Sequence, residues 1–283
     1  MLDFLIRLDR RWVFLLMLLA VSTPVLLGLR FPEVTSPKVR TVFDTIEKLP
    51  AGSRVLITLD YDPASEGELT PMASGFTRHC CEKGLRLYYM TLWDRGPIMV
   101  QKMQTLIQKE YPERVYGRDY VNLGYRAGEK GVIKNALSDL TKEFSTDQSG
   151  QSLSHWPMTA GLKSLQEMDL IITVGSGSPG PQEWLQYAGA QYNVPMVAGT
   201  VGVQAPQLYP YLPKPLYGML GAIKDAAEYE QALLLAYPKL AELPNAQEGM
   251  RRMGPQLVAH LLMVGLIVMG NLIAVFERKR RAA

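Results

Sequence analysis

The stretch "DLIITVGSGSPGPQEW", residues 169 to 184, decides the predicted fold, because it reads as a buried strand, a glycine-rich turn and a helix start. Its strand is a continuous apolar run, which is typical of a parallel sheet covered on both faces. Gly175, Gly177 and Gly180 follow with the spacing G-x-G-x-x-G, which also occurs in dinucleotide-binding turns. These glycines could therefore cradle a phosphate, or they could only turn the chain.

The rest of the middle of the chain alternates strands with helices. Three further buried strands are predicted at "RVLITLDY" (54–61), "LRLYYMTLW" (85–93) and "VPMVAGT" (194–200), with helical periodicity between them. This alternation predicts the α/β class, with a Rossmann-like, doubly wound and mostly parallel sheet. We expect this domain to occupy residues 31–240, followed by a linker at 241–254.

Two uncharged runs flank the domain, at residues 12–29 and 255–276. A helix rises about 1.5 Å per residue and the hydrocarbon core is about 30 Å thick, so both runs are long enough to be transmembrane helices. The first run could instead be a signal peptide cleaved near "AVS" at 20–22. The apolar run continues beyond that point, which favours a retained anchor.

Basic residues near the ends of the spans predict the orientation. They are densest in the two short terminal tails, residues 1–11 and 277–283, so both termini are expected in the cytoplasm and the domain outside it. We expect a bacterial inner or plasma membrane. The tail "ERKRRAA" is interpreted as a topology anchor rather than as a site for an anionic lipid.

Composition excludes some partners and cross-links. The chain is 47% hydrophobic and 20% charged with a net charge of +3, so no basic surface for nucleic acid is predicted. Its two cysteines, Cys80 and Cys81, are adjacent, and we expect buried free thiols rather than a disulfide framework.

The glycine turn is predicted to bind no nucleotide. A dinucleotide site needs an acid at the end of the next strand, whereas "VPMVAGT" ends in Thr200, and Pro179 and Pro181 interrupt the turn. A Gly-Lys-Ser/Thr phosphate loop is absent from the sequence. We therefore expect a tight turn and no cofactor.

Ligands of open parallel sheets bind outside the carboxyl ends of the strands, where the strand order reverses. The loops after the first and third predicted strands are expected to meet there. The acids at these ends favour a cation or a neutral polar molecule over a phosphate. The candidate ligand-binding residues are Asp60, Asp62, Ser65, Glu66, Trp93, Asp94, Ser176, Ser178 and Thr200.

Several of these acids also have a purely structural interpretation. Ser65 and Glu68 have the spacing of a helix capping box, and acids in a first turn stabilise the helix dipole. The sequence contains no metalloprotease or zinc motif and no Gly-x-Ser-x-Gly elbow, so neither a metal nor a catalytic residue is predicted.

The second predicted span carries polar and small residues suited to helix packing. His260 and Asn271 are eleven residues apart on one helical face, and Gly270 and Ala274 form a small-xxx-small pair. Outside the membrane, a tyrosine and proline segment is a candidate partner interface, or else covers its own sheet. Its tyrosines are Tyr209, Tyr211 and Tyr217.

Together these features predict a membrane protein with an α/β domain. The leading hypothesis is a non-enzymatic subunit or scaffold that self-associates or joins other membrane proteins. The alternative is an extracytoplasmic sensor or binding protein for a small polar or cationic ligand, and an enzyme of unknown reaction comes third. Fold alone does not decide between them.

Overall fold

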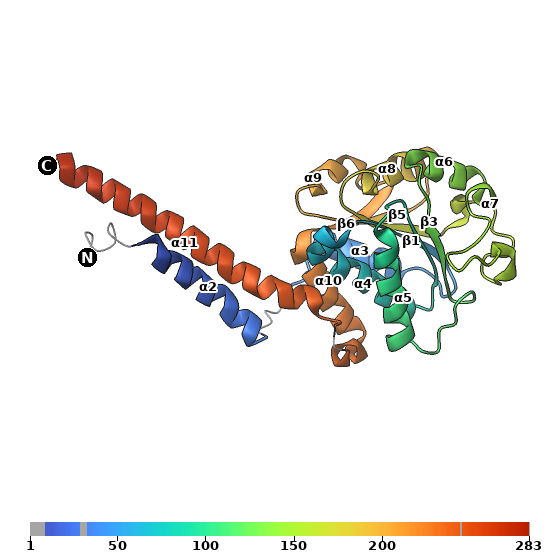
Figure 1. The fold of residues 1–283 in the computed structure, drawn as a ribbon, viewed down its shortest axis with the longest axis horizontal. Helices are drawn as coiled ribbons and strands as arrows, with labels where there is room; N and C mark the ends of the chain where they lie inside the picture. Colours follow the sequence, from blue (N-terminus) through green and yellow to red (C-terminus); the bar gives the residue numbers. More distant parts are fainter. Residues whose placement is uncertain (1–8, 29–32, 244, 283) are drawn as a thin grey trace. The chain divides into compact units, whose positions relative to one another are not determined.

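The computed structural model describes residues 9–28, 33–243 and 245–282 (Figure 1). It divides into two units, which are described separately: an α/β unit of residues 33–249, and a unit of the two terminal segments, 1–32 and 250–283. Most of the predicted N-terminal tail and the end of the first predicted span, residues 29–32, lie outside the described residues.

The α/β unit is built on a six-stranded parallel sheet with the order β3-β2-β1-β4-β5-β6. This arrangement confirms the predicted Rossmann-like parallel sheet. Nearly every strand residue is buried, which explains the continuous apolar runs in the sequence. The strands are β1 (Arg54–Asp60), β2 (Arg86–Thr91), β3 (Tyr120–Tyr125), β4 (Leu170–Gly175), β5 (Met196–Thr200) and β6 (Leu216–Gly221).

Two of these strands were not predicted, and both lie at the edges of the sheet. Strand β3 has the sequence "YVNLGY", in which Asn122 and Gly124 interrupt the apolar run. Strand β6 begins directly after the prolines of the tyrosine and proline segment, which interrupt the apolar pattern before it. An edge strand has a neighbour on one side only, so its sequence carries a weaker strand signal.

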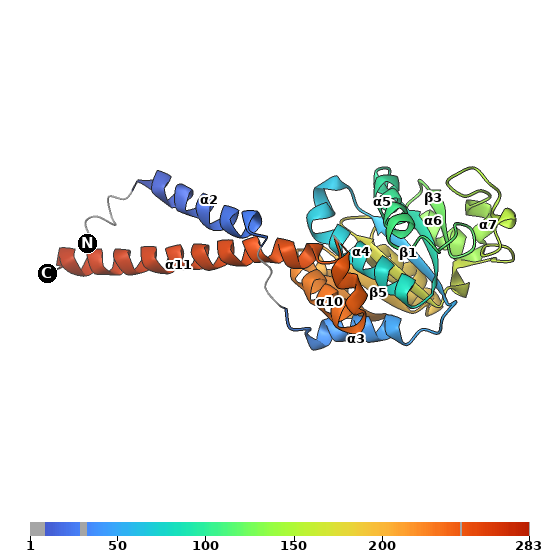
Figure 2. The same ribbon diagram turned by 90° about the horizontal axis from the view of Figure 1, so that it is seen from below.

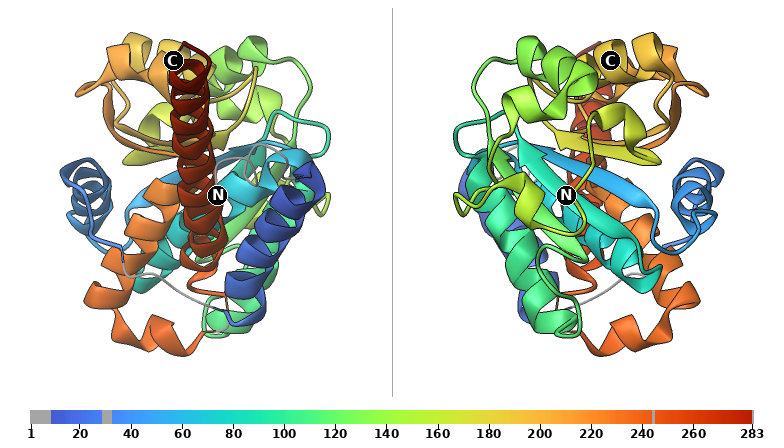
Figure 3. Two further views of the ribbon diagram at one scale, coloured as in Figure 1. Left: turned by 90° about the vertical axis from the view of Figure 1, so that its left-hand side faces the viewer. Right: turned by 90° about the vertical axis from the view of Figure 1, so that its right-hand side faces the viewer.

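Helices cover both faces of the sheet in two layers (Figures 1 and 3). Figure 2 shows the first layer, which comprises α3 (Pro37–Glu47), α4 (Glu66–Glu82), α5 (Gly96–Glu110) and α10 (Ala222–Ala236). The second layer comprises α6 (Lys130–Ser138), α7 (Leu140–Glu143), α8 (Pro181–Trp184), the π-helical turn η4 (Leu185–Ala190) and α9 (Ala205–Leu208). Short 3-10 helices complete the unit: η1 (Pro63–Ser65), η2 (Leu153–His155), η3 (Leu165–Glu167), η5 (Tyr209–Tyr211) and η6 (Pro238–Glu242).

The polar segment 145–155 forms a loop that packs on the α/β unit. Asp147 is buried and accepts hydrogen bonds from the Tyr116 hydroxyl and from Trp156 Nε1, both at 2.9 Å. The backbone N–H of Gln148 donates to the carbonyl of Asn122 on edge strand β3. The loop therefore covers this edge of the sheet, which protects it from pairing with other chains.

The terminal segments form two helices, α2 (Arg10–Leu26) and α11 (Glu248–Ala282). Among the described residues, one helix is long and apolar enough to cross a membrane, over Glu248–Val275. Helix α2 has 17 residues, ends at Leu26 and does not meet this criterion, so the structure does not support a transmembrane helix in the predicted first span, residues 12–29. The predicted linker is also shorter than expected, because α11 begins inside it.

Candidate functional site

The strand order reverses between β1 and β4, whose carboxyl ends lie side by side. Asp60 pairs in register with Gly175, and the backbone N–H of Ser176 donates to the Asp60 carbonyl. The hydroxyls of Ser65 and Ser176 lie 2.8 Å apart, within hydrogen-bonding distance. The predicted meeting of the first and third loops at the switch point is therefore confirmed.

Asp60 lies at this point but is fully buried. Its carboxylate accepts hydrogen bonds from the backbone N–H of Leu92 at 2.7 Å and from Trp184 Nε1 at 2.9 Å. Burial raises the pKa of Asp60 to about 6, and these hydrogen bonds partly oppose the rise. Asp60, at the end of β1, is therefore hydrogen-bonded both to the loop after β2 and to helix α8. Sequence reasoning did not identify Trp184, whose only signal was an aromatic residue one turn into the helix after the glycines.

The glycine turn uses its backbone N–H groups within the protein. Gly177 donates to Gln204 Oε1 at 2.8 Å, and Gly180 donates to Glu183 Oε2 at 2.8 Å. Each glycine is also required sterically. A Cβ on Gly175 would lie 2.9 Å from the Asp60 carbonyl oxygen, and a Cβ on Gly180 would lie 2.5 Å from the Gly177 carbonyl oxygen. Gly177 itself has a φ of +92°, which side chains rarely allow. These contacts are those of a tight turn.

Other candidates at the strand ends also bond to nearby protein groups. Thr200 Oγ1 donates to the Gly175 carbonyl at 3.1 Å, and Ser178 Oγ donates to Glu183 at 2.5 Å. Asp62 accepts from the N–H of Ala64 and so caps η1. Ser176 and Ser178 both lie on the loop after β4, which meets the loop after β1 at the switch point.

The predicted capping box was wrong. Ser65 precedes α4 but its side chain makes no cap hydrogen bond, while Glu68 accepts from the N–H of Gly202 in the loop after β5. Glu66 forms an ion pair with Lys102 of α5 at 2.6 Å. These acids therefore link loops and helices around the switch point instead of capping one helix.

A cavity of about 460 Å³ opens beside the switch point, between the loops after β2, β3 and β4. Trp93 is fixed on one side, because its Nε1 donates to the Pro179 carbonyl at 2.6 Å. Gly177 packs close to the indole, and a Cβ there would lie 3.1 Å from the ring. The lining residues are Leu92, Trp93, Asp94, Tyr125, Ala127, Gly128, Glu129, Ser178 and Pro179. We call this cavity the Trp93 pocket.

Trp93, Asp94 and Ser178 of the Trp93 pocket were identified from the sequence. Tyr125 and Glu129 were missed because Tyr125 is the last residue of β3, the strand that was not predicted, and Glu129 lies in the loop after it. The pocket contains two aromatic rings and two exposed carboxylates, and none of its lining residues, all of them described by the structure, is a lysine or arginine. Such a lining attracts cations through charge and through the ring faces.

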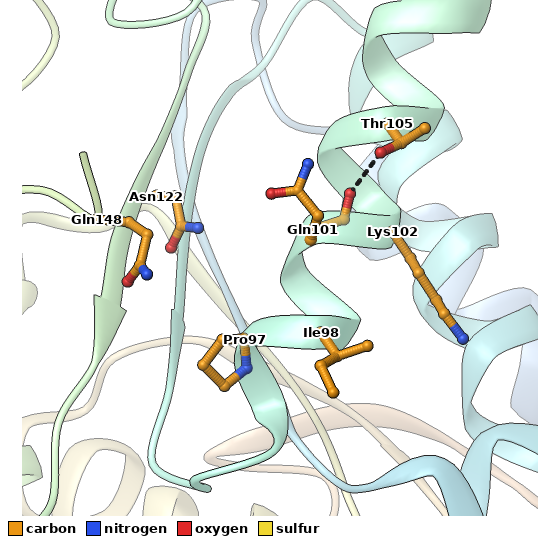
Figure 4. Close-up of a pocket in the computed structure, with 7 residues that line it drawn as sticks. All are labelled: Pro97, Ile98, Gln101, Lys102, Thr105, Asn122 and Gln148. Carbon is orange, nitrogen blue, oxygen red and sulfur yellow. Dashed lines mark hydrogen bonds between the residues drawn. The ribbon is translucent and has the colours of Figure 1, made fainter.

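A second cavity, of about 530 Å³, lies between α5 and edge strand β3 (Figure 4). Pro97 and Ile98 line one end, and the amide side chains of Gln101, Asn122 and Gln148 line the middle. Asn122 is engaged with Gln104 and with the N–H of Gly124, so it holds β3 against α5. No candidate residue from the sequence lies in this cavity.

The remaining candidate residues have mixed environments. Tyr209 is 50% exposed, whereas the Tyr211 hydroxyl accepts from Gln186 at 3.1 Å and Tyr217 lies near Lys214. Two tyrosines therefore contact their own domain. On α11, the residues predicted to pack against other helices are exposed in the single chain: His260, Gly270, Asn271 and Ala274. Cys80 and Cys81 are buried free thiols, as predicted.

Comparisons with known proteins identify no family for this chain. No protein-family model and no curated protein matches it. Among solved structures it is similar to one described as "crystal structure of AibC", with 16% sequence identity and a TM-score of 0.29. The match covers 81% of this chain and 50% of that one, so the chain spans half the length of that structure.

Proposed function

We propose that this protein is a membrane-anchored α/β domain that binds a small cationic or neutral polar molecule in the Trp93 pocket. One observation carries the proposal: the pocket lies at the carboxyl edge of the sheet beside the switch point, where ligands of this fold class bind. A binding protein for a small ligand was the alternative hypothesis from the sequence. The geometry of the pocket favours it over a scaffold.

The chemistry of the pocket supports a cation most strongly. Asp94 and Glu129 come from different loops and supply two carboxylates, while Trp93 and Tyr125 supply aromatic rings. A cation near an aromatic face gains about 0.5 to 2 kcal/mol, depending on how far it is desolvated. The hydrogen bond from Trp93 to Pro179 holds the indole before a ligand arrives, which reduces the ordering cost of binding.

The proposal includes the membrane arrangement expected from the sequence. Helix α11 is long and apolar enough to cross a membrane, and residues 12–29 are uncharged and would form a second span. With basic residues concentrated in both terminal tails, we place the termini in the cytoplasm and the α/β domain outside it, in a bacterial inner membrane.

A scaffold remains the second candidate function, supported by an exposed apolar surface after β5. Val203 is 86% exposed and Tyr209 is 50% exposed, and both belong to the segment that leads into β6. Exposed aromatic and apolar side chains of this kind favour protein contacts. Exposed His260 and Asn271 on α11 would add hydrogen bonds between helices in the membrane.

The ligand proposal can be tested with two probes that differ in charge but not in shape. Choline and its neutral isostere 3,3-dimethylbutanol would each be titrated into the full chain in a neutral detergent, with heat as the readout. We expect saturable binding of choline, and binding of the alcohol weaker by about tenfold or more. Equal affinity for both would contradict the preference for a cation, and tighter binding of acetate than of either would contradict the proposal as a whole.

A further inference from the structure

A third cavity lies away from the Trp93 pocket, between α4, α5 and the chain that leads into α11. It measures about 200 Å³. Its polar lining comes from three separate segments, and the residues that matter here are Ser74, Arg78, Lys102, Lys109, Glu110 and Glu248. The proposed function uses none of them.

Arg78 is the unusual residue of this cavity, because it is a charged side chain that is only 2% exposed. Its Nε and Nη2 atoms donate to the two oxygens of Glu110 at 2.7 and 2.9 Å. The remaining nitrogen, Nη1, is buried and has no hydrogen-bond partner within the described structure. Leaving a buried charged donor unpaired is unfavourable, so an acceptor is expected beside it.

The charges around the cavity favour an anionic acceptor. Both oxygens of Glu110 are already engaged by Arg78, which leaves that carboxylate neutralised. Lys102 pairs with Glu66, and Lys109 is an exposed ammonium at the end of α5 that forms no ion pair within the described residues. With Glu248 and the Glu66 that pairs with Lys102 included, three cations face three carboxylates, and the donors left without a protein acceptor within the described residues are Arg78 Nη1 and the Lys109 ammonium.

We infer that this cavity binds a single phosphate group, with the free Nη1 of Arg78 and the ammonium of Lys109 as its main donors. The hydroxyl of Ser74 is a third donor, whose hydrogen bond in the structure is a long one of 3.9 Å to Met103 Sδ. The volume of about 200 Å³ is below the usual range of drug-sized ligand pockets, about 300 to 1,000 Å³, which limits the occupant to one small group. Free inorganic phosphate and the phosphate of a lipid headgroup share this chemistry.

The test uses the full chain and keeps the two phosphate sources apart. Inorganic phosphate is titrated calorimetrically into protein in neutral detergent, and nanodiscs with or without phosphatidic acid are compared in a separate binding measurement. Binding of inorganic phosphate assigns the site to the free anion, binding of phosphatidic acid alone assigns it to a headgroup, and either result supports a phosphate site. Competition between the two would place both at one site.

Substitutions at two of the proposed donors test whether phosphate binds in this cavity. Lys109→Gln and Ser74→Ala should each weaken phosphate binding by about threefold to tenfold. The matched control is Lys48→Gln, which removes the same charge from an exposed lysine at the end of α3. Thermal unfolding of each variant shows whether the fold is kept.

Two outcomes would overturn the inference. One is no saturable binding from either source below about 10 mM, in which case Nη1 meets only water. The other is binding that falls equally in Lys48→Gln and Lys109→Gln, which would indicate a general charge effect. The cavity is separate from the Trp93 pocket, so a failure of the phosphate inference would leave the expected result of the choline titration unchanged.

Discussion

Asp60 looks like a ligand-facing acid in the sequence, because it ends a buried strand at the switch point. In the structure, its two oxygens are occupied by Leu92 and Trp184. The acids that remain exposed beside the Trp93 pocket, Asp94 and Glu129, lie on the two neighbouring loops.

The first prediction concerns Asp60. Asp60→Asn replaces one acceptor oxygen with an amide N–H that would face a donor, either Leu92 N or Trp184 Nε1. We expect a loss of about 1 to 3 kcal/mol in the free energy of unfolding, measured by denaturant titration. The control is Asp62→Asn, at a partly exposed cap that asparagine also satisfies, which should change stability by less than about 0.5 kcal/mol. Equal effects would contradict this role.

The second prediction concerns pH and His79. This histidine is buried, with Nδ1 at 2.6 Å from the Tyr229 hydroxyl and Nε2 at 2.9 Å from Glu47. Burial lowers its pKa to about 4, from 6.5, although Glu47 opposes the shift and nearby Lys83 adds to it. Between these two values the unfolded chain binds more protons at this site than the folded chain does, so rising pH stabilises the fold.

The variant His79→Gln isolates this contribution. The difference in unfolding free energy between the wild-type protein and the variant should grow as pH rises from about 4 to about 6.5, and then become constant. A parallel titration of His155→Gln, at an exposed position, serves as the control. A wild-type advantage that shrinks over this range would mean that His79 is charged in the folded protein.

At the scale of elements, the sequence was most informative where a segment is buried on both sides. The four central strands β1, β2, β4 and β5 carry continuous apolar runs, which the sequence pattern identifies directly. The edge strands were missed because Asn122, Gly124 and several prolines weaken their patterns. Because β3 was missed, two of the five polar and aromatic residues that line the Trp93 pocket, Tyr125 and Glu129, were not predicted.

The third prediction tests the glycine turn as an element. Gly180→Ala would place a Cβ 2.5 Å from the Gly177 carbonyl oxygen, so we expect a loss of about 1 to 3 kcal/mol in unfolding free energy. Gly131→Ala on α6 is the control. It has no atom within 4 Å of the added carbon and should be neutral or stabilise by up to about 1 kcal/mol. A tolerated Gly180→Ala would contradict a tight turn.

At the scale of the whole molecule, the fourth prediction concerns topology. Protease added to intact spheroplasts should digest the α/β domain, because we place residues 33–249 outside the cytoplasm. A tag added after Ala283 should stay protected, since the basic tail is expected inside. A digested tag in sealed spheroplasts would contradict the orientation. Detergent-permeabilised cells provide the control, in which both parts become accessible.

The central claim is that Asp94 and Glu129 of the Trp93 pocket bind a cation, and one affinity comparison tests it most directly. The double variant Asp94→Asn/Glu129→Gln should lose choline affinity by about tenfold or more relative to the wild-type protein. The control, Asp62→Asn/Glu113→Gln, removes the same charge outside the pocket and should bind choline as the wild-type protein does. Choline binding that is unchanged in the pocket variant, or equally reduced in both variants, would contradict the claim.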